Sequence, residues 1–383
     1  MATTNKLKIG LVLDDSLDKP DGVQQYVLSI GEWLRAQGHD VHYLVGQTER
    51  IDLKNVHSLS RNIGVRFNGN RLTIPRASSR QKLRALMVAE QFDVLHVQMP
   101  YHPLLAHRLI LAAGPETVVI GTFHIVAYSP LVQLATRVLA VWLRRSLARF
   151  DKLFSVSTAA VDYARQTFKI ETTVSPNVID YPRFHLAKGR PEYDDGQRTI
   201  LFLGRLVQRK GCLLLLRAVT LLARDASLPK FRVVICGKGP LLADLEQYVV
   251  DHQLQDIVQF VGFVSEADKP SYYASADIAV FPSSGGESFG IVLLEAMASG
   301  KAAVLAGDNS GYHSVMAPEP RLLFDPHDAA ELALKLEHLL KMSHGREAAA
   351  AWGKTYSKTF DVAIVGRQLL KDYQEALHKR RSP

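Results

Sequence analysis

The chain has 383 residues, of which 47% are hydrophobic, and its 46 lysines and arginines against 38 aspartates and glutamates give a formal net charge of +8. This length and composition suit a globular protein with two domains. No apolar run reaches the roughly 18 residues that a membrane span needs, and residues 1–8 lack the apolar segment of a signal peptide, so we expect a cytoplasmic protein.

The first predicted unit is a buried strand at residues 7–13, followed by a loop and by a helix from about residue 22 to residue 37. A strand, a glycine turn and a helix at the start of a chain are typical of a doubly wound sheet. Gly22 would let the backbone approach a ligand at this turn. The Gly-x-Gly-x-x-Gly fingerprint is absent, which argues against a dehydrogenase.

Further strands are predicted at residues 41–45, 93–97, 118–121 and 152–156, and helical segments alternate with them. This alternation predicts an α/β fold with a parallel sheet that is covered on both faces. His124 follows the strand at 118–121, at the sheet edge where such folds bind ligands. An ordinary core or surface histidine is the alternative.

The excess positive charge lies in the first half of the chain, because residues 1–185 carry 22 basic and 15 acidic residues and the remainder 24 and 23. A half with this excess of positive charge could bind nucleic acid or an anionic membrane, or it could simply expose a solvated basic face. Basic residues surround a predicted helix at 78–90. A second helix at 131–150 combines Trp142 with arginines, which fits either an interfacial membrane helix or an ordinary helix with a solvated edge.

Residues 176–197 are rich in proline and glycine and are predicted to be the interdomain linker. A second series of strands and helices begins at residues 199–203, and its first turn carries Arg205, Arg209 and Lys210. Guanidinium and ammonium groups on a strand-to-helix turn suit a diphosphate, although a solvated loop is the alternative.

Two later turns have the same form. The strand at 233–236 precedes Gly237 and Lys238, and the strand at 256–262 precedes Val264, with Lys269 after it. The last predicted element is a helix at residues 361–381.

A glycine-rich turn that begins at Gly285 follows a predicted strand at 277–281 and carries Glu287. Ser288 is a plausible N-cap for a helix over residues 289–298, and such a turn suits an anionic or hydroxyl-rich ligand. Glu295 lies inside this apolar helix, where a carboxylate is costly without a partner, and sugar hydroxyls are suitable donors. The alternative is a half-exposed Glu295 and a loop charge at Glu287.

The paired glutamates after Gly-Gly resemble the motif of the retaining glycosyltransferases of family 4. The form Gly-Glu-Ser-Phe-Gly-Ile-Val-Leu is most similar to that of the bacterial phosphatidyl-myo-inositol mannosyltransferases. The resemblance implies the GT-B fold, in which two Rossmann-like doubly wound parallel-sheet domains face each other across a cleft. Residues 1–182, with a crossover helix at 361–381, would face the acceptor and the membrane, and residues 198–358 would bind the nucleotide sugar.

The resemblance also implies roles for single residues. The catalytic positions would be His124, Arg205, Lys210 and Glu287. The donor-binding positions would be Gly22, Arg209, Gly237, Lys238, Val264, Lys269, Ser288, Phe289, Gly290, Ile291 and Glu295. The acceptor would meet Gln24 and Asn68, and anionic phospholipid would meet Arg71, Arg76, Arg80, Lys82 and Arg84. Asp21 stands where the family usually has a first glycine.

The resulting expectation is a retaining enzyme that moves mannose from GDP-mannose onto a lipid polyol such as phosphatidyl-myo-inositol, peripherally on the inner face of the plasma membrane. The alternatives are a UDP-sugar-dependent transferase acting on diacylglycerol or a soluble acceptor, a GT-B nucleotide-sugar epimerase, and a non-catalytic binding protein. No metal or other cofactor is expected, and the Asp14-Asp15 and Asp194-Asp195 pairs are interpreted as loop charges. Nucleic acid is disfavoured because the basic residues lack interleaved aromatics.

Overall fold

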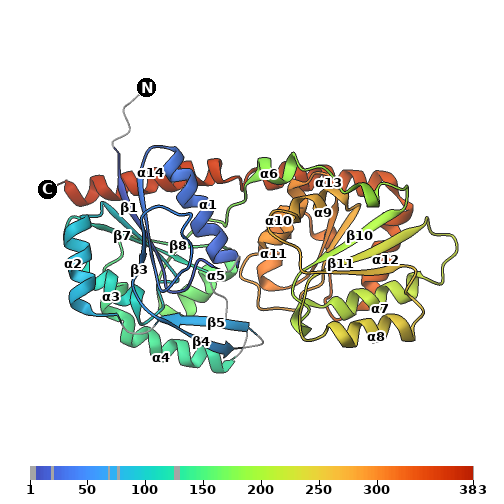
Figure 1. Cartoon of the computed structure of the whole chain (residues 1–383), viewed down its shortest axis with the longest axis horizontal. Helices are drawn as coiled ribbons and strands as arrows, with labels where there is room; N and C mark the ends of the chain where they lie inside the picture. Colours follow the sequence, from blue (N-terminus) through green and yellow to red (C-terminus); the bar gives the residue numbers. More distant parts are fainter. Residues whose placement is uncertain (1–5, 19–20, 68–69, 76–77, 125–129, 383) are drawn as a thin grey trace. The chain divides into compact units, whose positions relative to one another are not determined.

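The computed structural model describes residues 6–18, 21–67, 70–75, 78–124 and 130–382, and the side chains of these residues except those of 63–67, 70–75 and 130–135. The chain forms two compact units (Figure 1). The first unit comprises Met1–Val178 and Val362–Pro383, and the second comprises Ile179–Asp361. Each unit contains a parallel sheet with helices packed on it, which is the predicted α/β class.

The first unit holds a seven-stranded sheet in the order β3-β2-β1-β6-β7-β8-β9. Its strands are β1 (Lys8–Leu13), β2 (Asp40–Val45), β3 (Val56–Ser58), β6 (Val94–Gln98), β7 (Val118–Phe123), β8 (Lys152–Ser155) and β9 (Thr173–Val174). All of their pairings are parallel. The strand order reverses between β1 and β6, so the carboxyl ends of these two strands flank a ligand crevice of the doubly wound type.

Helices pack on both faces of this sheet. They are α1 (Gly22–Ala36), α2 (Arg80–Glu90), α3 (Leu105–Ala112), α4 (Pro130–Leu147), α5 (Thr158–Tyr163), which continues into a π-helical turn at Ala164–Phe168, and α14 (Val362–Arg381). The last helix of the chain lies beside α1 (Figure 1), and both bury apolar side chains against the sheet. Gly366 makes this contact possible, because a Cβ there would lie 2.6 Å from the ring of Trp33.

An antiparallel hairpin of β4 (Asn62–Phe67) and β5 (Asn70–Pro75) precedes α2, and it was not predicted from the sequence. The predicted helix at 78–90 begins two residues later, at Arg80. Ser79 is its N-cap and accepts a hydrogen bond from the backbone N–H of Lys82. In the described part of the chain, no helix is both long and apolar enough to cross a bilayer.

The second unit holds a six-stranded parallel sheet in the order β12-β11-β10-β13-β14-β15. Its strands are β10 (Arg198–Leu203), β11 (Phe231–Cys236), β12 (Val258–Gly262), β13 (Ile278–Phe281), β14 (Ala303–Gly307) and β15 (Leu323–Phe324). Its α-helices are α6 (Tyr181–His185), α7 (Cys212–Leu222), α8 (Leu242–Asp251), α9 (Lys269–Ser275), α10 (Ile291–Ala298), α11 (Ser310–Met316), α12 (Ala329–Lys341) and α13 (Ser343–Lys358). Short 3-10 turns lie at Pro191–Tyr193, Gln208–Lys210 and Pro320–Leu322.

The predicted linker at 176–197 is wrong for most of its length. Residues from Ile179 onward belong to the second unit, and α6 packs against α9 and α10. The buried aromatic rings of Tyr181 and Phe184 anchor this segment, and Phe184 lies 6.0 Å from the ring of Tyr273. Apolar anchoring therefore outweighs the proline and glycine content that suggested a free connection.

Candidate functional site

The second unit brings its predicted site residues together where its strand order reverses. Strand β10 lies between β11 and β13, so the turns after β10 and β13 leave the sheet side by side. The first turn carries Arg205, Arg209 and Lys210, and the second carries Glu287. Residues about 80 positions apart in the sequence thereby meet at the edge where doubly wound sheets bind ligands.

Backbone contacts fix these two turns against each other. Gly211 has a φ of +72°, and a Cβ there would lie 2.0 Å from the carbonyl oxygen of Pro282. The backbone N–H of Ser284 donates to the carbonyl oxygen of Arg209 at 2.9 Å. Only glycine fits such a close approach, so the β10 turn is held directly against the end of β13.

Glu287 is the centre of a compact charge cluster. Arg209 Nη1 lies 2.6 Å from its Oε1, Lys210 Nζ lies 2.9 Å from the same atom, and Ser283 Oγ donates to it at 3.0 Å. The Glu287 side chain is 14% exposed. Burial disfavours its charged form, but Lys210 and Arg209 outweigh burial and hold the pKa of the carboxyl below its ordinary value.

This cluster links two predicted roles that the sequence kept apart. Lys210 was predicted on the turn that suits a diphosphate and Glu287 on a separate glycine-rich turn that suits an anionic or hydroxyl-rich ligand, and the structure places the two side chains in contact. Two cations against one carboxylate leave a net positive charge at the end of the sheet, which suits an anion. Arg205 lies on the same turn and is exposed.

The glycine-rich turn after β13 leads into α10, but the helix begins later than predicted. Its N-cap is Gly290, not Ser288, with a φ of +114°, and the first helical residue is Ile291. A Cβ at Gly290 would lie 2.6 Å from the ring of Tyr312. Phe289, which was predicted to bind the donor, is buried, and its ring centroid lies 5.8 Å from that of Phe360. Its side chain therefore packs inside the second unit.

Glu295 has a partner within the protein. Lys269 Nζ lies 3.1 Å from its Oε1, and the hydroxyl of Tyr273 donates to Oε2 at 3.3 Å. Lys269 also lies 2.9 Å from Glu266. Lys269 and Glu295, both predicted to bind the donor, therefore contact each other, and both are buried.

Burial is the largest influence on this pair. It raises the pKa of Glu295 above its ordinary value even though Lys269 opposes the shift. For Lys269, burial lowers the pKa, but Glu295 and Glu266 outweigh it and the net shift is upward.

The turn after β11 carries Gly237 and Lys238. A Cβ at Gly237 would lie 1.9 Å from the carbonyl oxygen of Gly204, so this turn rests on the start of the β10 turn. The exposed Lys238 passes over Gly262 at the end of β12, with its Cε 3.7 Å from a Cβ built there. Val264 is half-buried beyond that strand. These predicted donor contacts share one edge of the sheet.

The first unit gathers its predicted ligand residues at the carboxyl ends of β1, β6 and β7. His124 is buried, its Nε2 lies 2.7 Å from Gln98 Oε1, and its ring meets that of Tyr26 edge to face at 5.3 Å. Burial lowers the pKa of His124 to about 3, so the imidazole is neutral near pH 7. Gln24, in the first turn of α1 after Gly22, is buried and donates to Asp15 Oδ2 at 3.1 Å.

Asp14 and Gln98 are candidate ligand residues that sequence reasoning missed. Asp14 was interpreted as a loop charge, but it is fully buried, and its Oδ1 accepts a hydrogen bond from the backbone N–H of Ala106 at 2.6 Å. Within the described residues, Asp14 Oδ2 and Gln98 Nε2 are buried atoms without a hydrogen-bond partner. Such atoms at a sheet edge suit ligand hydroxyls. Asp14 directly follows β1 and Gln98 ends β6, and these strand-end positions could have identified both residues from the sequence.

Some predicted positions fall outside the described residues. These are Asn68 and Arg76, together with the side chain of Arg71, whose backbone lies in β5. The remaining predicted membrane residues, Arg80, Lys82 and Arg84, are exposed on α2.

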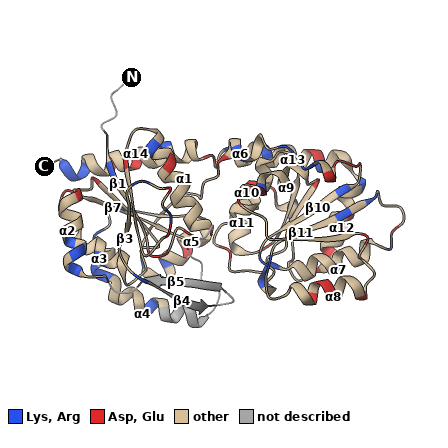
Figure 2. Ribbon diagram, viewed as in Figure 1, with Lys and Arg blue, Asp and Glu red and all other residues tan. Residues whose placement is uncertain are grey.

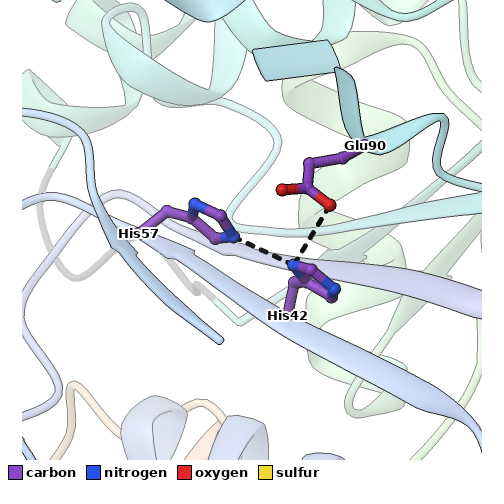
Figure 3. Close-up of side chains that lie close together, drawn as sticks. All are labelled: His42, His57 and Glu90. Carbon is purple, nitrogen blue, oxygen red and sulfur yellow. Dashed lines mark hydrogen bonds and ion pairs between the residues drawn. The ribbon is translucent and has the colours of Figure 1, made fainter. Parts of the chain in front are cut away.

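A group with the composition of a metal site lies elsewhere in the first unit (Figure 3). It consists of His42 on β2, His57 on β3 and Glu90 at the end of α2. His42 Nδ1 lies 2.9 Å from His57 Nε2, which is a hydrogen bond between the two rings, and Lys8 Nζ lies 2.5 Å from Glu90 Oε2 and lowers the pKa of that carboxyl. These hydrogen bonds and ion pairs explain why the three side chains lie together without a metal ion. His42 also stands in the first half of β2, whereas ligands of such sheets bind at the carboxyl ends of the strands.

Comparison with known proteins agrees with this architecture. Residues 20–183 match the family described as Glycosyltransferase Family 4, and residues 186–358 match Glycosyl transferases group 1. The phosphatidyl-myo-inositol mannosyltransferase of Mycolicibacterium smegmatis is 32% identical over 374 residues, which cover 96% of this chain and 94% of that protein. The alpha-monoglucosyldiacylglycerol synthase of Streptococcus pneumoniae is 24% identical, with 96% and 88% covered.

Solved structures share the fold. A glycosyltransferase from Rickettsia africae aligns with a TM-score of 0.75 at 18% identity and covers 98% of this chain and 99% of its own. Anabaena HepE in complex with UDP and glucose aligns at 0.72 and 18% identity, with 96% and 100% covered. These neighbours are GT-B glycosyltransferases. This chain is therefore a glycosyltransferase with the GT-B fold, and it belongs to the family 4 glycosyltransferases that include the phosphatidyl-myo-inositol mannosyltransferases.

Proposed function

We propose that this enzyme transfers mannose from GDP-mannose, with retention of anomeric configuration, to a lipid polyol such as phosphatidyl-myo-inositol at the inner face of the plasma membrane. The observation that carries the proposal is the Arg209–Lys210–Glu287 cluster, which sets two cations and a carboxylate at the ligand edge of the second unit. The names of relatives at 32% identity support mannose and the inositol lipid.

The charges suggest a division of labour on the donor. Arg205 and Lys210 would stabilise the negative charge that grows on the departing diphosphate, because fixed cations act most strongly where charge develops. The donor phosphates would draw Lys210 from Glu287, and the carboxylate would then accept hydrogen bonds from hydroxyls of the transferred sugar. His124, neutral at its low pKa, would serve as a hydrogen-bonding group and not as a cation.

The first unit offers suitable partners for a polyol. The amide of Gln24, the carboxylate of Asp14 and the amide of Gln98 provide buried hydrogen-bond donors and acceptors. Asp14 and Gln98 stand at the ends of the neighbouring strands β1 and β6, and Gln24 lies in the first turn of α1. An inositol ring presents several hydroxyls, which both donate and accept, so this chemistry fits the uncharged, polyhydroxylated ring of the acceptor.

The direct test is product analysis with GDP-mannose and phosphatidyl-myo-inositol in vesicles. We expect a lipid-linked α-mannoside, identified by the anomeric proton in NMR spectra. Consumption of GDP-mannose without a mannosylated lipid, or conversion of GDP-mannose to an epimeric nucleotide sugar, would contradict the proposal.

The base of the donor nucleotide is less constrained by these observations than the transferred sugar. A UDP-sugar is the second candidate donor, because HepE was solved in complex with UDP and glucose. A thermal-shift panel of GDP-mannose, UDP-glucose and UDP-galactose separates the two, since a ligand stabilises the folded protein according to its occupancy. The largest increase in melting temperature should come from GDP-mannose.

Replacing Glu287 with glutamine should separate chemistry from nucleotide binding. We expect turnover to fall at least about tenfold, because a charge-assisted contact of roughly 1.5–3 kcal/mol with the sugar is lost. Affinity for free GDP should stay constant or rise, since Arg209 and Lys210 lose the carboxylate that competes for them. Calorimetry with GDP and steady-state kinetics measure the two quantities, and a parallel loss of both would contradict the sugar role.

We also propose that transfer needs no metal ion, because cationic side chains stand at the predicted diphosphate position. Activity in a buffer with EDTA should equal activity with added Mg²⁺ or Mn²⁺. Abolition by EDTA and recovery with a divalent ion would show that a metal shares the diphosphate charge with Lys210.

A further inference from the structure

The ligand edge of the second sheet continues from the charge cluster toward β12. The turns after β10, β11 and β12 form one row, because their backbones are hydrogen-bonded to the neighbouring strand. The N–H of Gly204 donates to the carbonyl oxygen of Cys236 at 2.9 Å, and the N–H of Gly237 donates to that of Gly262 at 2.7 Å. We call these three turns the turn row. Neighbouring strands lie about 4.8 Å apart, so the row covers about 10 Å from β10 to β12, a distance that a ribose and one phosphate can bridge.

The chemistry of the turn row changes along its length. Its first two turns carry basic side chains (blue in Figure 2), namely Arg205, Arg209, Lys210 and Lys238. The turn after β12 begins instead with Phe263 and Val264. A nucleoside diphosphate has the same order of chemistry, since its charged phosphates are followed by the ribose and a flat, uncharged base. The β13 turn on the other side carries Glu287, which is proposed to hold the transferred sugar, so the nucleoside would extend toward β12.

The exposure of Phe263 is unusual in this chain. Among the phenylalanines whose side chains the structure describes, Phe263 alone is exposed, at 64%. A solitary exposed apolar side chain elsewhere on a surface would need no explanation. Phe263, however, directly follows the last residue of β12, at the edge of the sheet where ligands bind.

The backbone before Phe263 is irregular. In the pairing of β11 with β12, Ile235 lies opposite Phe260 and Cys236 lies opposite Gly262, so Val261 is an extra residue in β12. Gly262 then has a φ of +83°. Such bulges are rare between parallel strands, and next to binding sites they re-aim a side chain. The strand is therefore shaped at the point where it presents Phe263.

We propose that the ring of Phe263 stacks on the base of the donor nucleotide and favours a purine over a pyrimidine. The inference rests on the proposed function and deepens it, because it supplies a residue that selects a GDP-sugar over a UDP-sugar. Aromatic side chains stack on every base, and differences between bases follow the strength of stacking. Guanine has two fused rings and uracil has one, so guanine covers more of the phenyl ring.

Calorimetry with Phe263→Ala tests the proposal, with GDP, UDP and inorganic pyrophosphate as the three ligands. We expect affinity for GDP to fall at least about fivefold, which is the lower end of the effect of base–aromatic stacking. Affinity for UDP should fall by a smaller factor, so the ratio of GDP affinity to UDP affinity decreases. Pyrophosphate has no base, and its affinity should not change. In steady-state kinetics, KM for GDP-mannose should rise while kcat stays constant, because the base is bound equally before and during the reaction.

Further variants separate stacking from apolar contact. Phe263→Trp should keep wild-type affinity for GDP and add a fluorescence signal that GDP quenches and pyrophosphate does not. Phe263→Leu keeps much of the apolar volume without an aromatic face, and it should recover only part of the loss. The matched control is Leu221→Ala, which removes another exposed apolar side chain at the far end of α7 and should bind all three ligands as wild type does. Equal melting temperatures check that the variants are folded.

Three results would overturn the proposal. The first is wild-type affinity for GDP in Phe263→Ala. The second is an equal loss of GDP and pyrophosphate affinity, which would show that the ring supports the turn and does not touch the base. The third is full recovery by Phe263→Leu, which would assign an apolar contact without stacking. The proposed function fails in a different way: wild-type protein that binds UDP more tightly than GDP contradicts GDP-mannose as the donor, whereas a loss of UDP affinity in Phe263→Ala would still place the base on this ring.

Discussion

Replacing Lys210 with alanine should lower kcat/KM with the nucleotide sugar at least about tenfold and weaken the binding of the free nucleoside diphosphate. Lys210 Nζ lies 2.9 Å from Glu287, at the turn where the diphosphate is proposed to bind. A charge-assisted contact contributes roughly 1.5–3 kcal/mol, which corresponds to a factor of ten or more. Arg205→Ala, on the same turn, should have an effect of similar size. Steady-state kinetics and calorimetry measure the two losses.

The fold should survive the Lys210 substitution, because Arg209 still pairs with Glu287 at 2.6 Å. A melting temperature close to that of wild type therefore checks that the loss is functional. Arg217→Ala, an exposed position on α7, provides a matched loss of one charge away from the turn and should keep full activity. Wild-type kinetics in both Lys210→Ala and Arg205→Ala would remove the diphosphate assignment from this turn.

Local sequence patterns were enough to place these turns at one edge of a sheet. Apolar runs that alternate with helical segments predict parallel strands, and the carboxyl ends of parallel strands lie on one side. Arg205 and Glu287 each follow such a strand, so their common location was predictable. The same reasoning placed His124 at the ligand edge of the first sheet, where it follows β7.

Contacts between distant side chains were not predictable in this way. The sequence showed that Glu295 stands in an apolar helix and needs a partner, and it suggested a ligand. The partner is Lys269, 26 positions earlier, because α9 packs against α10 and brings its first residue to this carboxylate. Periodicity assigns a residue to a helix face, but it does not say which other helix covers that face.

Burial of single polar residues was also beyond local reasoning. Asp14 and Asp15 look alike in sequence, yet Asp14 is fully buried and accepts a hydrogen bond from the first turn of α3. The segment at 179–197 has the proline and glycine content of a linker, whereas its aromatic residues Tyr181 and Phe184 dock it on the second unit. In both cases the deciding contact is made with residues far along the chain.

The second large effect is expected for the stability of the second unit. Lys269→Met keeps the aliphatic stem but leaves Glu295 without its counter-ion in a site where the Glu295 side chain is 3% exposed. Removing one partner of a buried pair costs about 3–5 kcal/mol of unfolding free energy, since the remaining charge stays desolvated. Lys341→Met is the matched control, because Lys341 also contacts two carboxylates, Asp225 and Glu337, but at the surface. Its loss should be at most about 1 kcal/mol in urea unfolding.

The pH dependence of this loss identifies its cause. Burial already raises the pKa of Glu295, and without Lys269 the pKa should rise further. The folded variant then holds a proton that the unfolded chain releases above the ordinary glutamate pKa. Its unfolding free energy should therefore fall relative to wild type as pH rises from about 5 to about 8. Glu295→Gln in the Lys269→Met background should remove most of this slope, because no ionisable carboxyl remains at the position. An equal loss at both ends of that range would show that Lys269 stabilises the unit through the packing of its stem and not through the charge of Glu295.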